Sequence, residues 1–243
     1  MMDQQPVMKL ALIGMGKMGR AIAQLAPERG FHVVAELDPA RSTAAGVSRE
    51  SLNGAQVAIE FSVPDAAPAN IRACLAAGCP VVVGTTGWYE HLPAIRLDVE
   101  ASGGALLAAP NFSVGVAIFH RIVAEAARLF AGISGFESHL VETHHGAKKD
   151  APSGTAASLA HTVAEVSGAE IDITSIRVGS VPGTHELVFD GAFEQIRLIH
   201  EARDRRVFAE GALVAARWLV GRRGVFTMQD VLSTPTGQRG TSP

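Results

Sequence analysis

The stretch LALIGMGKMGRAIAQL, residues 10–25, decides the fold. A short apolar run leads directly into GMGKMG, and helix formers follow, which is the strand, turn and helix order that opens a βαβ unit. Gly14 permits the tight turn, Gly16 lets the backbone approach a pyrophosphate, and Gly19 allows the helix to pack closely, with its N-terminus toward the anion. The stretch therefore predicts a dinucleotide-binding turn. Its residues are Gly14, Met15, Gly16, Lys17, Met18 and Gly19.

Four more short apolar runs follow the turn, in FHVVAELD, QVAIEFSVP, PVVVGTTG and ALLAAPNFS, and helical ANIRACLAAG lies among them. Fully apolar runs of about five residues that alternate with helical segments are typical of a parallel sheet covered on both faces. The first part of the chain is therefore predicted to be an α/β domain of the Rossmann type.

The pattern changes after Asn111. A helix is predicted over residues 114–130, followed by FESHLVETHH, which alternates like a strand. Later strands punctuated by Pro-Gly and Asp-Gly turns predict an antiparallel or mixed sheet that ends near Phe208. The helical AEGALVAARWLVG can then return to the first domain. We therefore expect one domain made of residues 1–112 and 209–243, and an α+β domain with a mixed sheet over residues 113–208.

Three further segments are predicted to complete the nucleotide site. Either Glu36 or Asp38, at the end of the second strand, can bind the ribose hydroxyls. GTTG and APNF follow the fourth and fifth strands at the carboxyl edge of the sheet, where they can wall a nicotinamide or be ordinary turns. The residues of these two walls are Gly84, Thr85, Thr86, Ala109, Pro110, Asn111 and Phe112.

The choice between NADH and NADPH depends on charge beside the ribose. No arginine comes immediately after either acid, so NADH is expected to be used at least as well as NADPH. Lys17 and Arg41 are the only nearby cations that could bind a 2′-phosphate.

The stretch VETHHGAKKDAPSGTAASL, residues 141–159, is the second dense group of functional side chains. One turn can bring His144 and Lys148 together as a proton donor beside an ammonium, while His145 points elsewhere on an extended backbone. Ser153, Gly154 and Thr155 precede helix formers, and hydroxyls with backbone N–H groups at a helix start can hold a carboxylate or phosphate.

Simpler interpretations of this stretch are a helix N-cap, a solvated loop, or a metal site. No metal is expected, because neighbouring histidines diverge, Glu142 alone does not complete a ligand set, and Cys74 and Cys79 are remote. The two cysteines are expected to be free thiols in a reducing compartment.

HHGAKKDAPSGTA closely resembles the signature of the 4-hydroxy-tetrahydrodipicolinate reductase family, also called dihydrodipicolinate reductase. The likeness extends over GKMG, VVGTTG, APNFSVGV, PGTHE, FAEGAL and MQDVL, although the family's usual GxxGxxG turn is one residue longer than GMGKMG. The resemblance implies that His144 and Lys148 form the catalytic pair. It also implies that a second group binds substrate: His145, Ser153, Gly154, Thr155 and Arg205.

The resemblance implies reduction of a cyclic imine dicarboxylate by NADH or NADPH with net loss of water, in the diaminopimelate route to lysine. It also implies a homotetramer formed through residues 113–208. Alternatives are another nicotinamide-dependent dehydrogenase of this architecture, or a non-catalytic nucleotide-binding regulator.

Composition excludes some partners. The net charge of −3 gives no general attraction to nucleic acid or anionic membranes. No apolar run is long enough for a membrane span, and the first residues lack a basic flank before a long apolar stretch, so a cytoplasmic location is expected. A hydrophobic content of 47% in 243 residues is ample for a core.

Overall fold

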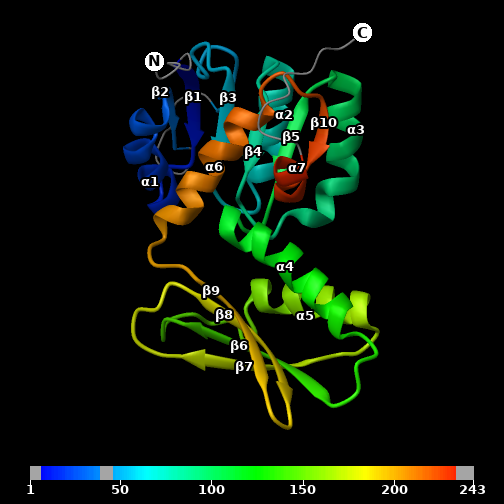
Figure 1. Cartoon of the computed structure of the whole chain (residues 1–243). Helices are drawn as coiled ribbons and strands as arrows, with labels where there is room; N and C mark the ends of the chain where they lie inside the picture. Colours follow the sequence, from blue (N-terminus) through cyan, green and yellow to red (C-terminus); the bar gives the residue numbers. More distant parts are fainter. Residues whose placement is uncertain (1–6, 39–45, 234–243) are drawn as a thin grey trace, which may run out of the picture. The chain divides into compact units, whose positions relative to one another are not determined.

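The computed structural model describes residues 7–38 and 46–233 (Figure 1). The chain divides into two compact units. The first contains the residues up to Phe112 together with those from Phe208 onward, and the second is Ser113–Val207.

The first unit is built on a six-stranded sheet in the order β10-β5-β4-β3-β1-β2, and every neighbouring pair is parallel. The parallel sheet predicted from the apolar runs is confirmed, since four strands are fully buried or nearly so. Its strands are β1 (Met8–Ile13), β2 (Phe31–Leu37), β3 (Val57–Glu60), β4 (Val81–Val83), β5 (Ala105–Ala108) and β10 (Gly224–Phe226).

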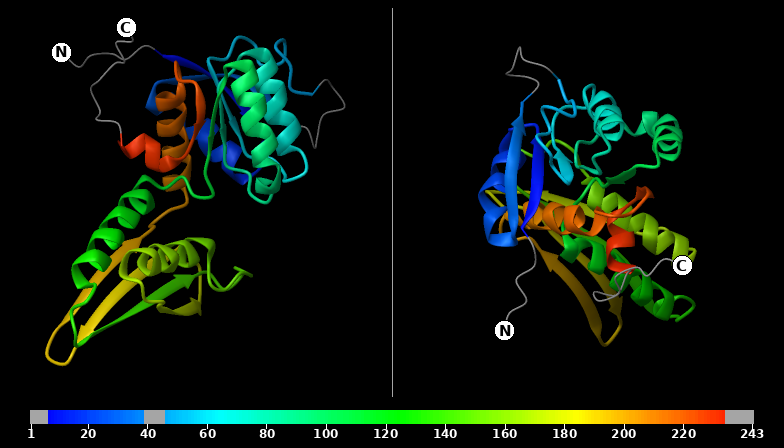
Figure 2. Two further views of the ribbon diagram at one scale, coloured as in Figure 1. Left: turned by 90° about the vertical axis from the view of Figure 1, so that its right-hand side faces the viewer. Right: turned by 90° about the horizontal axis from the view of Figure 1, so that it is seen from above.

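Helices cover both faces of this sheet. Figure 2 shows α1 and α6 on one face and α2 and α3 on the other. Ile71 of α2 and Ile95 of α3 are completely buried in one apolar cluster with the sheet. The helices of this unit are α1 (Lys17–Leu25), α2 (Ala67–Ala77), α3 (Leu92–Ser102), α6 (Arg206–Leu219) and α7 (Met228–Ser233), with short 3-10 turns at Pro27–Arg29 and Tyr89–His91.

The second unit has a four-stranded sheet in the order β7-β6-β8-β9. The β6–β7 pair is parallel and the other pairs are antiparallel, so the predicted mixed sheet is confirmed. Helices α4 and α5 pack on one face of the sheet, around Leu140, Leu159 and Leu187, all of them completely buried. The elements are α4 (Val114–Phe130), β6 (Phe136–His144), α5 (Gly154–Ser167), β7 (Asp172–Arg177), β8 (Thr184–Gly191) and β9 (Gln195–Glu201).

The end of this sheet differs from the sequence prediction. The last strand stops at Glu201 rather than near Phe208, and α6 begins at Arg206, three residues before the predicted helix. The Asp204 side chain accepts a hydrogen bond from the Arg206 N–H at 2.7 Å, so Asp204 helps to start the helix.

Candidate active site

A cavity of about 440 Å³ lies at the carboxyl edge of the first sheet, beside the glycine turn. The turn that follows β1, the residues after β3 and the GTTG loop after β4 line it, because the carboxyl ends of parallel strands meet at one edge. Of the residues proposed from the sequence, six line the cavity, and three others were missed. The first group is Gly16, Lys17, Met18, Gly84, Thr85 and Thr86, and the second is Phe61, Ser62 and Pro64.

The three glycines of the turn have different surroundings. Gly14 has φ +91°, and a Cβ there would lie 2.1 Å from the carbonyl oxygen of Phe61. A Cβ on Gly19 would lie 2.1 Å from the Gly14 oxygen, so the first turn of α1 packs against the loop without room for a side chain. Gly16 has nothing within 4 Å of the same position and lines the cavity, so its backbone is open to a ligand.

The wall of the cavity after β3 is held to the GTTG loop. The Ser62 N–H donates to Thr85 Oγ1 at 2.8 Å, and a Cβ on Gly84 would lie 2.1 Å from the Phe61 ring. The buried Glu60 accepts hydrogen bonds from Ser62 and from Asn70 Nδ2. The EFSVP segment also lies at the carboxyl end of a parallel strand, so its residues could have been predicted as part of the nucleotide site on the same grounds as GTTG.

The APNF segment lies behind this wall. Phe112 contacts the Phe61 ring edge-on, with centroids 5.8 Å apart, and the Ala109 N–H donates to the Val83 oxygen at 3.2 Å. Ala109 and Phe112 are buried, Asn111 is partly buried and Pro110 is exposed. None of the four lines the cavity, so their role as a nicotinamide wall stays a prediction.

The two acids at the end of β2 lie beside the glycine turn: Glu36 is in the strand and Asp38 follows it. The Gly14 N–H donates to the carbonyl oxygen of Leu37 at 2.7 Å, which places both flanking residues near the turn. Glu36 is exposed and Asp38 is partly buried. Arg41, considered above as a partner for a 2′-phosphate, lies outside the described residues.

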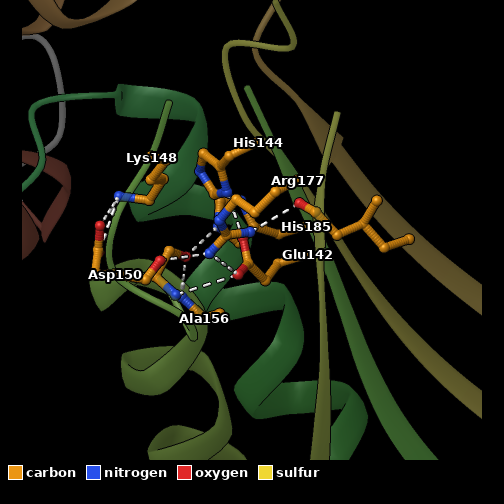
Figure 3. A network of polar contacts seen from close by, with 9 residues as sticks. Glu142, His144, Lys148, Asp150, Ala156, Arg177 and His185 are labelled. Atoms are coloured by element: carbon orange, nitrogen blue, oxygen red, sulfur yellow. Dashed lines mark hydrogen bonds and ion pairs between the residues drawn. The ribbon is translucent and has the colours of Figure 1, made fainter. Parts of the chain in front are cut away.

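The second group of polar residues is in the second unit, at the end of β6 (Figure 3). Glu142 and His144 are buried on one face of the strand, where alternate residues share a side. His144 Nδ1 is hydrogen-bonded to Glu142 Oε2. The other oxygen, Oε1, accepts from Arg177 Nη2 at 2.6 Å and from the Ser153 N–H at 3.3 Å.

These contacts shift the pKa values of Glu142 and His144. Burial opposes the charge on Glu142, but hydrogen bonds from Arg177, Ser175 and His144 outweigh it and lower the pKa of this carboxyl to about 2. Burial also lowers the pKa of His144, and the positive charges of Lys148 and Arg177 act in the same direction, whereas Glu142 opposes them. His144 is therefore a buried imidazole whose charged form depends on one carboxylate.

Lys148 lies on the turn that follows β6. The Lys148 N–H donates to the His145 oxygen at 3.0 Å, which closes the predicted turn between His144 and Lys148. Its ammonium is paired with Asp150, with Nζ at 2.8 and 2.9 Å from the two carboxylate oxygens. The counter-ion of the ammonium is therefore an exposed side chain, in an ion pair that solvent weakens.

The SGT segment begins α5. Ser153 is the N-cap, and its hydroxyl accepts from the Ala156 N–H at 3.2 Å and contacts His185 Nε2 at 3.2 Å. The hydroxyl is thus engaged within the protein, while Gly154 is exposed and Thr155 is partly buried at the helix start. The N-cap interpretation of Ser153 is confirmed, and anion binding at this helix start stays a prediction.

The other two proposed substrate ligands lie apart from this network. His145 is partly buried just after the strand, and its carbonyl oxygen accepts from the Lys148 N–H. Arg205 is exposed in the turn before α6, and no hydrogen bond or ion pair joins it to another residue of the described ranges.

Glu142, His144 and His185 have ligand atoms within 4.8 Å of one another, close enough for a metal ion. Their existing contacts weigh against one, since both oxygens of Glu142 already accept hydrogen bonds and the Arg177 cation occupies the position next to it. The geometry therefore fits an acid–base network better than a cation site.

Sequence reasoning missed Glu142, Arg177 and His185 as parts of this network. The signal for Glu142 was present, because it lies two residues before His144 on a predicted strand. Arg177 is 33 residues from His144 in the chain and reaches it only because β7 pairs in parallel with β6, where Arg177 is the register partner of His144. That pairing is not visible in the sequence.

A Rossmann-type unit with an open glycine turn, joined to a mixed-sheet unit that carries a buried His–Glu–Arg network, defines a nicotinamide-dependent oxidoreductase of two units. The family model described as "Dihydrodipicolinate reductase, N-terminus" matches residues 8–112, and "Dihydrodipicolinate reductase, C-terminus" matches residues 115–232. The chain belongs to the dihydrodipicolinate reductase family.

Relatives agree over nearly their full length. The chain is 36% identical over 240 residues to 4-hydroxy-tetrahydrodipicolinate reductase of Christiangramia forsetii, covering 93% of this chain and 98% of that protein. It is 38% identical over 243 residues to the reductase of Stenotrophomonas maltophilia strain R551-3, covering 95% and 100%. The chain is thus an NAD(P)H-dependent enzyme that reduces 4-hydroxy-tetrahydrodipicolinate in diaminopimelate and lysine biosynthesis.

Solved structures share the fold. A dihydrodipicolinate reductase from Paenisporosarcina sp. TG-14, with dipicolinate bound, superposes with a TM-score of 0.78 at 23% identity over 91% of this chain and 97% of that one. GenD2 from gentamicin A biosynthesis, in complex with NAD, gives 0.63 at 11% identity over 95% and 91%. No helix in the part of the chain that the structure describes has both the length and the apolar character needed to cross a membrane.

Proposed function

We propose that His144 and Lys148 carry the reduction, with the nicotinamide cofactor bound at the glycine turn of the first unit. The observation that supports this most is the buried His144 with its carboxylate partner, four residues from an ammonium whose counter-ion is exposed. A buried, oriented imidazole is suited to general acid catalysis.

The first unit fits a dinucleotide. Gly16 opens onto the cavity, the N-terminus of α1 points its N–H groups there, and Lys17 adds a positive charge. The bound cofactor supplies a hydride. Glu36 or Asp38 would hold the adenosine ribose, and because both are acids we propose that NADH is used at least as well as NADPH.

The substrate is a dicarboxylate, and the second unit offers cationic and N–H groups for it. Lys148 would bind one carboxylate by exchanging Asp150 for it. The start of α5 at Gly154 and Thr155 would bind through backbone N–H and hydroxyl groups, with His145 and Arg205 alongside. Because its hydroxyl caps the helix, Ser153 would act mainly by fixing this helix start. The dipicolinate bound in the Paenisporosarcina reductase supports a dicarboxylate site.

The protonation step belongs to His144. When hydride adds to the conjugated imine, electron density builds on the ring carbon next to the site of addition. His144 would donate its proton to that carbon, and Lys148 would stabilise the growing charge through its ammonium. We further propose that the enzyme works as a homotetramer in the cytoplasm.

Substitution of Lys148 tests the proposed anion site. Lys148→Ala removes a full charge, so the turnover number should fall and the Michaelis constant for the imine should rise by roughly 10-fold or more each. The assay follows nicotinamide absorbance while a synthase generates the imine from pyruvate and aspartate semialdehyde.

The neighbouring exposed lysine gives a matched control, since Lys149→Ala removes the same charge one residue away. It should leave both constants nearly unchanged, and both variants should bind NADH as the wild type does. Equal effects of the two substitutions would mean that only general surface charge matters, which would contradict the assignment.

A further inference from the structure

Glu142 is a completely buried carboxylate that has no role in the reaction proposed above. It lies two residues before His144 on β6, so both side chains project from the same face of the strand. A buried carboxylate is costly unless it is paired and hydrogen-bonded, and its place beside the imidazole calls for an explanation.

Every contact of Glu142 fixes its orientation. Oε1 accepts from Arg177 Nη2 at 2.6 Å and from the Ser153 N–H at 3.3 Å, and this leaves Oε2 directed at His144 Nδ1 (Figure 3). Arg177 is held in turn, since its Nη2 donates to the Asp150 oxygen at 2.5 Å and its Nη1 to the Ile176 oxygen at 2.8 Å. The carboxylate is therefore anchored on one side and presents one oxygen to the imidazole.

This arrangement assigns the two nitrogens of His144. An ionised carboxylate can only accept, so Nδ1 must carry a hydrogen, and Nε2 is the nitrogen that can lose a proton and regain it. Nε2 lies against Gly183, where a Cβ would be 2.9 Å away, so a side chain at position 183 would crowd this nitrogen.

We infer that Glu142, anchored by Arg177 and the Ser153 amide, is the positioning residue that holds His144 with Nδ1 protonated and Nε2 as the proton donor. This inference rests on the proposed role of His144 as the acid. In the step itself, the Nε2–H bond breaks and a C–H bond forms at the ring carbon that carries the electron pair after hydride addition. His144 becomes neutral, and its Nδ1–H stays hydrogen-bonded to Glu142.

Several charged and titratable groups surround the pair of Glu142 and His144, and some of them shift the pKa of His144. Lys148 and Arg177 disfavour the imidazolium of His144, and Glu142 is the group that favours it. His185 faces His144 from β8, with ring centroids 5.2 Å apart, and its own pKa is lowered to about 4, chiefly by burial. Two more groups lie near: Asp150 on the loop after β6, and His200, 6.5 Å from His185 by ring centroid. Loss of the Glu142 charge should therefore lower the pKa of His144 further.

The pH profile of turnover tests the inference. Activity needs protonated His144, so turnover falls as pH rises through the pKa of that group. In Glu142→Gln this fall should move to lower pH by about one unit or more, the usual effect of one adjacent charge. Turnover at pH 7.5 should fall by roughly 10-fold or more, as when a general acid is largely deprotonated. Glu142→Asp, which keeps the charge on a shorter side chain, should recover part of both changes.

Glu137 supplies the matched control, because it is an exposed glutamate on the same strand. Glu137→Gln should keep the wild-type profile and turnover. If Glu142→Gln lowered turnover by one factor at every pH, with the profile in its wild-type position, Glu142 would be only a structural residue and the inference would be wrong.

A measurement on the wild-type enzyme covers the case in which Glu142→Gln does not fold. Nitrogen-15 spectra of the histidine side chains, with His144 assigned by its absence in His144→Gln, should show Nδ1 protonated in the neutral ring. A neutral His144 protonated on Nε2 would overturn the inference. The nitrogen-15 spectra of the wild type and of His144→Gln do not depend on the reaction. If His144→Gln lost most of its turnover while Glu142→Gln kept the wild-type pH profile, the acid role of His144 would stand and only the positioning role of Glu142 would be rejected.

Discussion

His144 shows how one residue gains its chemistry from position. Burial lowers its pKa and favours the neutral ring, and Glu142 works against that by stabilising the imidazolium. Glu142 stays charged because Arg177 donates to it at 2.6 Å. The side chain that we propose as the proton donor is thus adjusted by one carboxylate and one guanidinium, neither of which is proposed to contact the substrate.

His185 is predicted to make stability depend on pH. Its pKa is lowered to about 4 in the folded chain, chiefly by burial, while the pKa of an imidazole in an unfolded chain is about 6.5. As pH falls from 6.5 to 4 the unfolded state binds a proton that the folded state does not bind. The free energy of unfolding should then decrease by an amount of the order of 3 kcal/mol. Denaturant titrations at several pH values measure it.

The control for this prediction is an exposed histidine of the same unit. His161, on α5, has a side chain 72% exposed, so His161→Gln should keep the wild-type slope of stability against pH. His185→Gln should flatten that slope between pH 6.5 and 4. Parallel curves for wild type and His185→Gln would show that this imidazole is not the buried neutral group.

At the scale of elements, the loop between β1 and α1 combines two different uses of glycine. Gly14 and Gly19 are needed for the fold, because a Cβ on either would lie 2.1 Å from a backbone oxygen. Gly16 is open at the same position and faces the cavity. Structure and ligand binding can therefore be separated by substitutions two residues apart.

The prediction for this loop compares Gly16→Ala with Gly14→Ala. Gly16→Ala should change the free energy of unfolding by less than about 1 kcal/mol and weaken NADH binding by about 10-fold, since its methyl group enters the space for the pyrophosphate. Gly14→Ala should cost more than about 2 kcal/mol, because it combines a positive φ with a backbone clash. Thermal unfolding and fluorescence titration with NADH provide the two readouts. A loss of stability in Gly16→Ala as large as in Gly14→Ala would contradict this separation.

Elements with strong local signals could be predicted from the sequence. The long helix Val114–Phe130 has the bounds that were predicted, and the buried strands were recognised as apolar runs. β10 was missed because it has only three residues and forms a strand only by pairing with β5. α3 was missed although Pro93 opens it and Ile95 and Val99 recur at helical spacing, so that signal was available.

The candidate site divides in the same way. The glycine turn and the HH-to-SGT stretch are local in the chain, and composition and spacing were enough to select them. The anchoring of His144 is not local, because it joins β6 to β7 through Glu142 and Arg177, 35 residues apart. Parallel pairing between distant strands is decided by packing of the whole unit, so no sequence window contains it.

At the scale of the whole molecule, the second sheet has one face that no helix of its own unit covers. α4 and α5 pack on the inner face, whereas Ile176 and Ile199 on the outer face are 41% and 55% exposed. The two isoleucines lie among polar side chains, such as the Glu186–Arg197 ion pair, and exposed apolar side chains on an uncovered sheet face favour association. In light scattering at micromolar concentration we expect a particle about four times the chain mass of 25.4 kDa, as the homotetramer proposal requires.

A substitution on that face makes the prediction specific. Ile199→Lys places a charge on the outer face at the edge strand β9 and should reduce the particle mass, while Leu97→Lys, on an exposed position of α3, should not. A wild-type particle of 25.4 kDa at micromolar concentration would contradict the tetramer.

The turnover of His144→Gln at neutral pH tests the central claim most directly. Glutamine keeps the size of the side chain and some hydrogen bonding but cannot act as an acid, so turnover should fall by roughly 10²-fold or more. The Michaelis constant for the imine should change less, and NADH affinity should be unchanged because the glycine turn is in the other unit. A variant that kept more than about a third of wild-type turnover would contradict the account, and the acid role would pass to Lys148 or to water.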